Sequence, residues 1–172
     1  MAKQPAKKRI VSKKNASYSR AFSEGLEILK DEIQLAFQWQ RPGILLVVQK
    51  SKLGQAKVQQ ALEKELIKTN KRVERMRATA KAPDVIRVMC NTSNRDEIVF
   101  FVSEISNADG ITSGKIYGAL NLHRELLVEQ RIRVIFWLTE AEAAQLPHRA
   151  PDFWAFRHRV IEFDPRLGTP KG

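Results

Sequence analysis

Short apolar runs without any polar interruption constrain the fold of this chain more than any other feature. Residues 44–48 read Ile-Leu-Leu-Val-Val after a Pro-Gly pair, and comparable runs cover residues 98–102 and 134–138. Strands buried on both faces have this composition, because alternation with polar residues is needed only where one face meets water. Residues 85–90 and 160–163 have the same β-branched or aromatic character. We therefore predict strands at all these runs, with 44–48 central and 160–163 at a late edge.

Stretches with helical periodicity separate most of these runs. Apolar residues recur at three- and four-residue steps over residues 22–37, and the pattern stops before Arg41-Pro42-Gly43. A second helix is predicted over residues 53–76, and a third over 113–130, with Ser113 as its N-cap. The inward residues expected of the second helix are Leu53, Ala56, Leu62, Leu66, Ile67 and Val73.

Alternation of strands and helices predicts the fold class and the organisation of the chain. It favours a three-layer α/β fold, in which helices cover both faces of a mainly parallel sheet. A length of 172 residues suits one such domain. We expect a basic, flexible tail at residues 1–20, a single α/β domain at 21–165 and a short C-terminal tail at 166–172.

Positive charge is concentrated at the start of the sequence. The formal net charge is +11, and residues 1–20 contain seven basic and no acidic side chains, which leaves only +4 for the rest. A solvated arm and a nucleic-acid-binding arm both remain open interpretations, and an organellar transit peptide is a third. The candidate contacts to nucleic acid in this arm are Lys7, Lys8, Arg9, Lys13 and Lys14.

The expected compartment is the cytoplasm. No apolar segment follows the basic residues as a secretory signal requires, and no run approaches the roughly 20 apolar residues of a membrane span. The single cysteine, Cys90, suits a reducing environment and is expected to be a buried small side chain.

A second basic feature lies in the predicted helix at residues 53–76. Its cations recur at steps of three, four or seven residues, which would align them on one helical face. Together with the tail, this stripe could bind along a phosphate backbone. The alternative is a solvated helical face, which the nearby glutamates favour. Besides Lys57, the stripe residues are Lys64, Lys68, Lys71 and Arg75.

The loop after the first strand is the first place to look for a nucleotide. In an open α/β sheet, phosphate ligands bind beyond the carboxyl ends of the strands. Aligned on Gly54, the phosphate-loop pattern G-x-x-x-x-G-K-[ST] meets Gln49, Gln55 and Ala56 at its other fixed positions. We therefore expect weak or no binding of Mg-ATP. The residues nearest to such a site are Lys50, Lys52, Gly54, Lys57 and, as the magnesium partner, Glu104.

Other chemical constellations are not supported. The three histidines lack the spacing of a metal site, and there is no second cysteine for a zinc site. Carboxylates follow the predicted strands at Glu104, Asp109, Glu140 and Glu142, and an acid/base pair among them would require two of them to face one cleft.

Three segments near the end of the chain resemble a known family. They are residues 120–126 (Leu-Asn-Leu-His-Arg-Glu-Leu), 134–140 (Val-Ile-Phe-Trp-Leu-Thr-Glu) and 150–157 (Ala-Pro-Asp-Phe-Trp-Ala-Phe-Arg). Their order resembles the LN-x-RE-x-L, V-hydrophobic-FWL and APD-[LF]-W-x-[WF]-R string of the ATPase-like domain in bacterial signal-transducing (STAND-type) NTPases. Those proteins often also carry tetratricopeptide repeats. The similarity covers about residues 43–163, and its specific part is residues 120–163.

This resemblance implies a P-loop-NTPase-like core with a regulatory role. Since the phosphate loop is not matched and no repeat array follows, we expect a degenerate, non-catalytic or weakly nucleotide-binding domain that meets a protein partner in trans. The alternative is a nucleic-acid-binding accessory protein that uses the tail and the stripe. Within the shared segments, we expect Trp137, Phe153, Trp154 and Phe156 to form one aromatic plug under the strands. Pro151 and Asp152 are expected to open a short helix.

Overall fold

The computed structural model describes the backbone of residues 6–106 and 109–163, and within these ranges the side chains from residue 20 onward. Helices and strands alternate along most of this chain. In order they are α1 (Ala6–Gln38), β1 (Gly43–Gln49), α2 (Lys52–Lys68), β2 (Arg72–Arg77), α3 (Val85–Cys90), the 3-10 helix η1 (Arg95–Glu97), β3 (Ile98–Ser103), α4 (Gly110–Glu129), β4 (Arg133–Leu138), α5 (Glu140–Arg149), α6 (Pro151–Phe156) and β5 (Arg159–Phe163).

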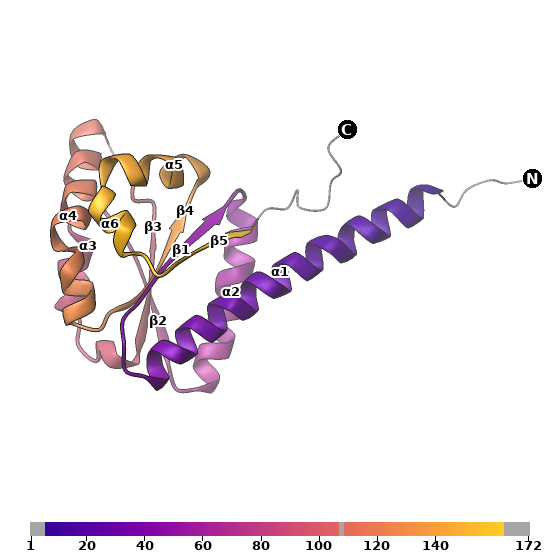
Figure 1. Cartoon of the computed structure of the whole chain (residues 1–172), viewed down its shortest axis with the longest axis horizontal. Coiled ribbons are helices and arrows are strands. Elements are labelled where there is room, and N and C mark those ends of the chain that lie inside the picture. Colours follow the sequence, from indigo (N-terminus) through magenta and orange to yellow (C-terminus); the bar gives the residue numbers. More distant parts are fainter. Residues whose placement is uncertain (1–5, 107–108, 164–172) are drawn as a thin grey trace, which may run out of the picture.

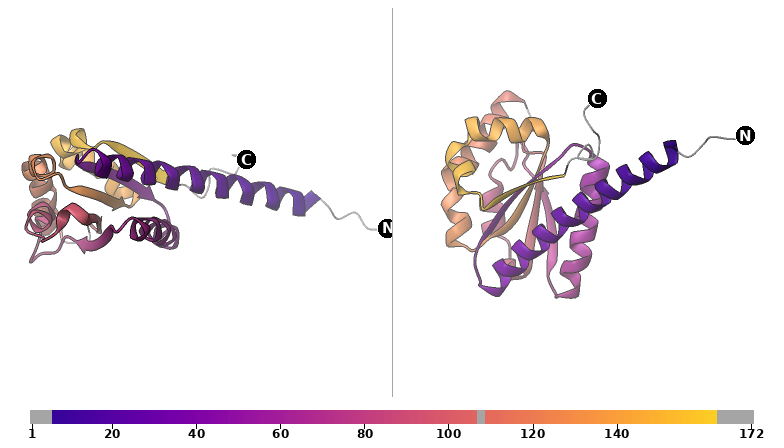
Figure 2. Two further views of the ribbon diagram at one scale, coloured as in Figure 1. Left: turned by 90° about the horizontal axis from the view of Figure 1, so that it is seen from below. Right: turned by 45° about the vertical axis from the view of Figure 1, so that its right-hand side comes forward.

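The strands form a single parallel sheet with helices on both faces. Its order is β2-β3-β4-β1-β5, and every pairing is parallel. Figures 1 and 2 show α1 crossing one face diagonally beside α2, while α3 to α6 lie over the other face. The predicted three-layer α/β architecture is therefore confirmed.

Side chains of each strand point alternately into two cores. Leu45 and Val47 of β1 pack with Leu29 and Ile33 of α1 and with Leu62 of α2. The neighbouring positions of the same strands face the opposite layer, which holds the apolar residues of α3, α4, α5 and α6. Both faces of the inner strands are thus covered, which explains why their sequences are uninterrupted apolar runs.

The connections that follow β1 and β4 run in opposite directions across the sheet. After β1 the chain passes through α2 on one face to reach β2 at the far edge, whereas after β4 it passes through α5 and α6 on the other face to reach β5. Adjacent strands whose connections leave on opposite faces open a crevice beyond their carboxyl ends, and ligands of open α/β sheets bind there.

Two predicted elements are wrong. The helix predicted over 53–76 ends at Lys68, and Arg72–Arg77 forms the edge strand β2. Residues 85–90, predicted as a strand, form the short helix α3, whose first turn is capped by the Asp84 carboxylate accepting from the Arg87 N–H at 3.1 Å. Val85, Ile86 and Met89 are buried on one side of this helix, so its β-branched residues serve helix packing.

Smaller corrections concern helix ends and strand positions. α4 begins at Gly110 with Asp109 as its N-cap, one turn before the predicted cap at Ser113. In α2 the buried residues are Gly54, Val58, Leu62 and Leu66, whereas Leu53 and Ile67 are exposed. β4 occupies the middle of the sheet and β1 lies beside it, while the predicted late edge strand is confirmed as β5.

The expected basic tail overlaps the first turns of α1. Side chains of residues 1–19, including all five tail cations proposed to contact nucleic acid, lie outside the described residues, so the flexibility of the tail stays a prediction. Among the helices that the structure describes, none is long and apolar enough to cross a membrane.

Candidate functional site

The connection that would cradle a phosphate is very short. Only Lys50 and Ser51 separate β1 from α2, and Ser51 is the N-cap of the helix. Its hydroxyl accepts a hydrogen bond from the Gly54 N–H at 3.1 Å, so Gly54 lies in the first helical turn and not in a loop. A phosphate loop needs several consecutive free N–H groups that curve around the anion. A connection of this length has no room for that curve.

Gln49 occupies the space in front of the first turn of α2. This side chain is buried, and a Cβ added at Gly54 would lie 2.7 Å from its amide nitrogen. In the orientation that satisfies both ends of the amide, its oxygen accepts from the Gln55 N–H at 3.3 Å and its nitrogen donates to the carbonyl of Phe163. The Gln55 N–H also donates to the Ser51 carbonyl at 2.9 Å within the helix, so Gln49 adds a second acceptor at this group, while the Ser51 hydroxyl caps the Gly54 N–H.

The crevice at the carboxyl end of β1 is an open pocket of about 320 Å³, which is lined by residues of β1, β5, α5 and α6. Lys50 lines it, and its ammonium group forms an ion pair with Glu140 at 3.0 Å. Glu162 and Trp154 line the same pocket. One cation beside two carboxylates gives the crevice a negative balance, which disfavours a phosphate ligand.

The other predicted nucleotide contacts do not meet in this crevice. Lys52 and Lys57 are exposed on α2 and do not line the pocket. Glu104 follows β3, and its carboxylate pairs with Arg77 at the end of β2 at 3.3 Å. β4 lies between β3 and β1, so the proposed magnesium partner and Lys50 belong to non-adjacent strands.

Carboxylates at the strand ends serve mainly the helix termini. Glu142 is buried, and its two oxygens accept from the Thr139 N–H at 2.9 Å and from the N–H and hydroxyl of Ser106 at 3.1 and 2.9 Å. Asp109 caps α4, and hydrogen bonds, first from the Thr112 N–H, lower the pKa of its carboxyl group. These bonds hold both groups as acceptors within the fold, so they do not form the acid/base pair considered from the sequence.

The residues that carry the family resemblance form a clamp between α4 and α6. The side-chain oxygen of Asn121 accepts from the Asp152 and Phe153 N–H groups at 2.8 and 3.2 Å, and so caps α6 from a neighbouring helix. The Arg124 guanidinium lies 5.4 Å from the centre of the Phe156 ring and 3.7 Å from the Asp152 carboxylate. The short helix that begins at Pro151 is confirmed, and these contacts assign the shared residues to packing and capping.

The single aromatic plug predicted for these segments is wrong. Trp137 packs edge-on against Phe101, with ring centres 5.1 Å apart, in the core under α1 and α2. Phe153 packs edge-on against Phe136 at 5.1 Å in the opposite core. Successive residues of β4 point to opposite faces, so the sheet itself separates the two aromatic pairs.

The basic stripe is divided between elements. Lys57, Lys64 and Lys68 lie on α2, whereas Lys71 lies in the following turn and Arg75 on β2, so the prediction of one helical face is wrong. The reason is that the helix ends at Lys68, where the backbone turns to start the edge strand.

Two of these cations are bound to neighbouring glutamates. Arg75 donates two hydrogen bonds to the Glu63 carboxylate, at 3.2 and 2.6 Å, and its guanidinium lowers the pKa of Glu63. Lys68 pairs with Glu65 at 2.9 Å. The electrostatic attraction of this surface for a phosphate backbone is correspondingly reduced.

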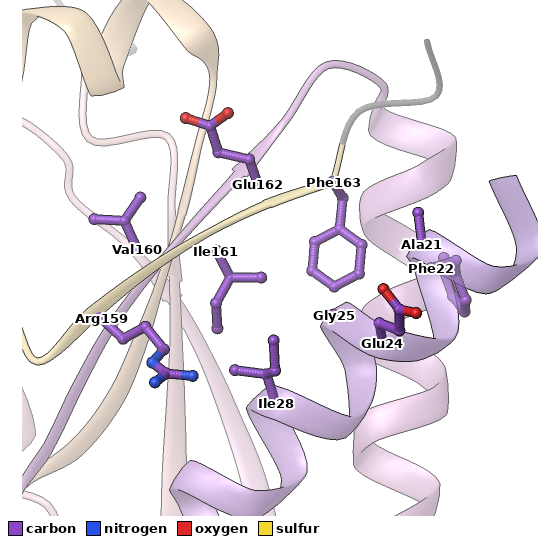
Figure 3. A pocket seen from close by; sticks show the side chains of 10 residues that line it. All are labelled: Ala21, Phe22, Glu24, Gly25, Ile28, Arg159, Val160, Ile161, Glu162 and Phe163. Carbon is purple, nitrogen blue, oxygen red and sulfur yellow. The ribbon is translucent and has the colours of Figure 1, made fainter. Parts of the chain in front are cut away.

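A further groove of about 370 Å³ runs between α1 and the edge strand β5 (Figure 3). Phe22, Gly25 and Ile28 of α1 face Ile161 and Phe163 of β5 across it. Its lining is largely apolar and belongs to the packing of α1 on the sheet.

Among the described residues, no group of three or more His, Cys, Asp or Glu side chains is placed to hold a metal ion. Cys90 is half-buried, and burial raises the pKa of its thiol, which makes it a poor nucleophile.

Sequence reasoning missed the role of Gln49. The available signal was a polar residue at the end of an otherwise apolar strand, directly before the helix N-cap. Comparison of the sequence with protein-family models and with curated proteins gives no match.

Proposed function

We propose that this chain is a non-catalytic regulatory domain, a degenerate relative of the signal-transducing NTPases that it resembles, and that it acts by binding a protein partner in trans. The observation that carries the proposal is that α2 follows β1 without a phosphate loop and that its N-terminus is capped by the chain itself. Only two residues separate β1 from α2, and the Ser51 hydroxyl caps the helix. The crevice that Lys50 lines also holds the carboxylates of Glu140 and Glu162. A domain with this arrangement keeps the architecture of a nucleotide switch without the means to hold triphosphate.

Support for a protein partner comes from the outer face of α4. At 77% and 71%, Ile111 and Leu122 are the most exposed large apolar side chains in the part of the chain that the structure describes. They lie about three helical turns apart on the same side of the helix. Gly118 lies between them, and a Cβ added there would meet nothing within 4 Å. This α4 patch, defined as Ile111, Gly118 and Leu122, offers two apolar anchors around a flat centre.

Calorimetry with Mg-ATP tests the non-catalytic part of the proposal. We expect no binding heat at micromolar to millimolar nucleotide, and no release of phosphate in a coupled assay. Micromolar affinity that is abolished by Gly54→Asp would show that the crevice binds nucleotide after all and would contradict the proposal.

Affinity capture with matched variants tests the protein partner. A tagged chain is compared with the double variant Ile111→Ser/Leu122→Ser and with the control Leu53→Ser, which changes an equally exposed leucine, at 69%, on α2. The patch variant should lose a captured protein that the wild type and the control both retain. Identical captures from all three proteins would remove the α4 patch as the contact surface.

A nucleic-acid-binding role is the second candidate, and one specific observation favours it. Lys57 and Lys64 are exposed on α2 and, among the described residues, have no carboxylate within ion-pair distance. Fluorescence anisotropy with DNA and RNA at low and physiological salt tests this role. Lys57→Gln/Lys64→Gln should weaken binding and lower the salt slope by about one unit or slightly less per lost phosphate contact. Lys68→Gln, which removes a lysine already paired with Glu65, is the control.

A further inference from the structure

Another pocket, which is basic, lies at the amino ends of the strands, at the opposite end of the sheet from the crevice. It has a volume of about 260 Å³ and is lined by Phe37, Gln40, Lys71, Asp96, Arg131 and Arg133. These residues come from segments far apart in the sequence: the end of α1, the turn after α2, η1 and the turn from α4 into β4. Figure 1 shows that α1 and α2 both end at this end of the sheet.

Arg133 is the central residue of this pocket. Its side chain is buried, with only 4% of the residue exposed. Two of its guanidinium nitrogens donate weakly to the Asp96 and Ala36 carbonyls, both at 3.4 Å. Its Nε has no hydrogen-bond partner, and no carboxylate among the described residues lies within ion-pair distance of it. Buried guanidinium groups are normally paired with a carboxylate or another anion, because an unpaired buried charge is costly.

The surroundings of Arg133 add further positive charge. Lys71 and Arg133 both lie against the Phe37 ring, at 4.6 and 4.3 Å from its centre. Burial lowers the pKa of Arg133, the charge of Asp96 opposes this effect, and Arg131 adds to it. Three cations beside one carboxylate leave two net positive charges around the cavity.

A structural role for these cations is the competing explanation. Three helices end here with a residue in the left-handed region, namely Gln40 after α1, Asn70 after α2 and Arg131 after α4. Carbonyl groups at helix C-termini attract cations. Backbone N–H groups already donate to one terminal carbonyl of each helix: Arg41 donates to Ala36, Lys71 to Leu66 and Ile132 to Leu127. The contact of Arg133 with the Ala36 carbonyl is the weaker of the two that this carbonyl accepts. The Nε of Arg133 still has no acceptor.

We propose that this pocket binds a phosphoryl group, either as free phosphate or as the monoester of a small molecule. A phosphoryl group carries on average about −1.5 to −2 charges at neutral pH, which matches the excess charge of the pocket. Its oxygens would accept from the Lys71 and Arg131 side chains, and the positive charge of the buried Arg133 would add to the attraction. The inference concerns the opposite end of the sheet from the crevice and does not depend on the proposed function.

Backbone amide NMR shifts measured during titration with inorganic phosphate at constant ionic strength test the proposal. We expect saturable shifts at Gln40, Lys71 and Arg131. Titration with glycerol 3-phosphate in parallel identifies the source of the phosphoryl group: tighter binding of the ester indicates a phosphorylated small molecule, and tighter binding of phosphate indicates the free ion. Acetate should bind at least tenfold more weakly than the better of the two. Equal affinity for acetate would overturn the assignment to phosphoryl groups.

Matched variants separate ligand binding from a general salt effect. Lys71→Gln and Arg131→Gln each remove a charge at the rim without opening the core, and each should weaken phosphate binding by about tenfold or more. Arg72→Gln removes the neighbouring exposed charge, which does not line the pocket, and should leave the affinity unchanged. The proposal would be overturned if the wild type gave no saturable shifts, or if the wild type and both rim variants gave equal shifts. The cations would then serve only the C-termini of the helices.

Discussion

The packing of α1 against β5 can be tested by one pair of glycine substitutions. A Cβ added at Gly25 would lie 2.6 and 2.7 Å from two carbons of the Phe163 ring, whereas one added at Gly118 meets nothing within 4 Å. Normal carbon contacts are about 3.5–4.0 Å, so the alanine at position 25 overlaps the ring by about 1 Å. Figure 3 shows the Phe163 ring directly above Gly25 on α1. Either the ring or the helix must therefore move.

The two alanines are expected to have clearly different effects on stability. In a helix interior, replacing glycine by alanine stabilises by about 0.8–1.0 kcal/mol, and Gly118→Ala should gain this amount. At position 25 the same gain is set against an overpacking cost of about 1–3 kcal/mol. The free energy of unfolding of Gly25→Ala should therefore lie about 1–3 kcal/mol below that of Gly118→Ala. In a domain of this size, that difference corresponds to melting temperatures about 2–12 °C apart.

Urea unfolding followed by circular dichroism measures the difference, and Phe163→Leu completes the test. The smaller side chain should remove most of the penalty of Gly25→Ala, so the double-mutant cycle should give a coupling energy of about 1 kcal/mol or more. Equal stabilisation by both alanines, with no coupling to Phe163, would refute the described seating of α1 on the edge strand.

Three further predictions concern the core, the clamp and the response to pH. Trp137→Ala should cost about 3–5 kcal/mol of unfolding free energy, because the ring is 1% exposed. The partly exposed Trp154 should cost clearly less when replaced by alanine, and equal losses in thermal unfolding would place the two rings in similar environments. Asn121→Ala removes the cap of α6 and should cost about 1–2 kcal/mol in chemical denaturation, and an unchanged midpoint would show that the cap is dispensable. Burial, and then the charge of Arg41, lowers the pKa of His158 from its ordinary value of 6.5, and its Nδ1 accepts from the Ile44 N–H, so the fold favours the neutral ring. The unfolded chain therefore binds more protons in the window below about pH 6.5, and the free energy of unfolding should fall there as pH drops. His158→Gln should flatten this decline, and an unchanged decline in the variant would contradict the assignment to His158.

The inner strands were predictable from the sequence because burial on both faces leaves a direct compositional trace. Residues 44–48, 98–102 and 134–138 lie in β1, β3 and β4 as predicted. The edge strand β2 was missed because it has a neighbour on only one side and carries arginines at positions 72, 75 and 77. Residues 85–90 were misassigned because β-branched residues also fill a short buried helix, and the Asp84 cap outweighs their strand propensity.

Less of the candidate site could be predicted. The sequence showed that the phosphate-loop pattern is not matched, but it could not show that Gln49 packs against the first turn of α2, since that depends on the short connection between β1 and α2. The basic pocket could not be predicted from the sequence either. Lys71, Asp96 and Arg133 are brought together only by the order of the strands.

Strand order also has a consequence for synthesis of the chain on the ribosome. β1 is made early, but both of its partners come late: Ile44 pairs with Val134 of β4, and Leu45 pairs with Arg159 of β5. At about 5–20 residues per second, the gap between these segments takes several seconds to more than ten seconds to translate. During this time one of the most apolar segments of the protein lacks both neighbours, and α1 and α2 are the elements already made that can shield it. The two helices that pack on this strand in the finished fold are thus synthesised before either of its partner strands.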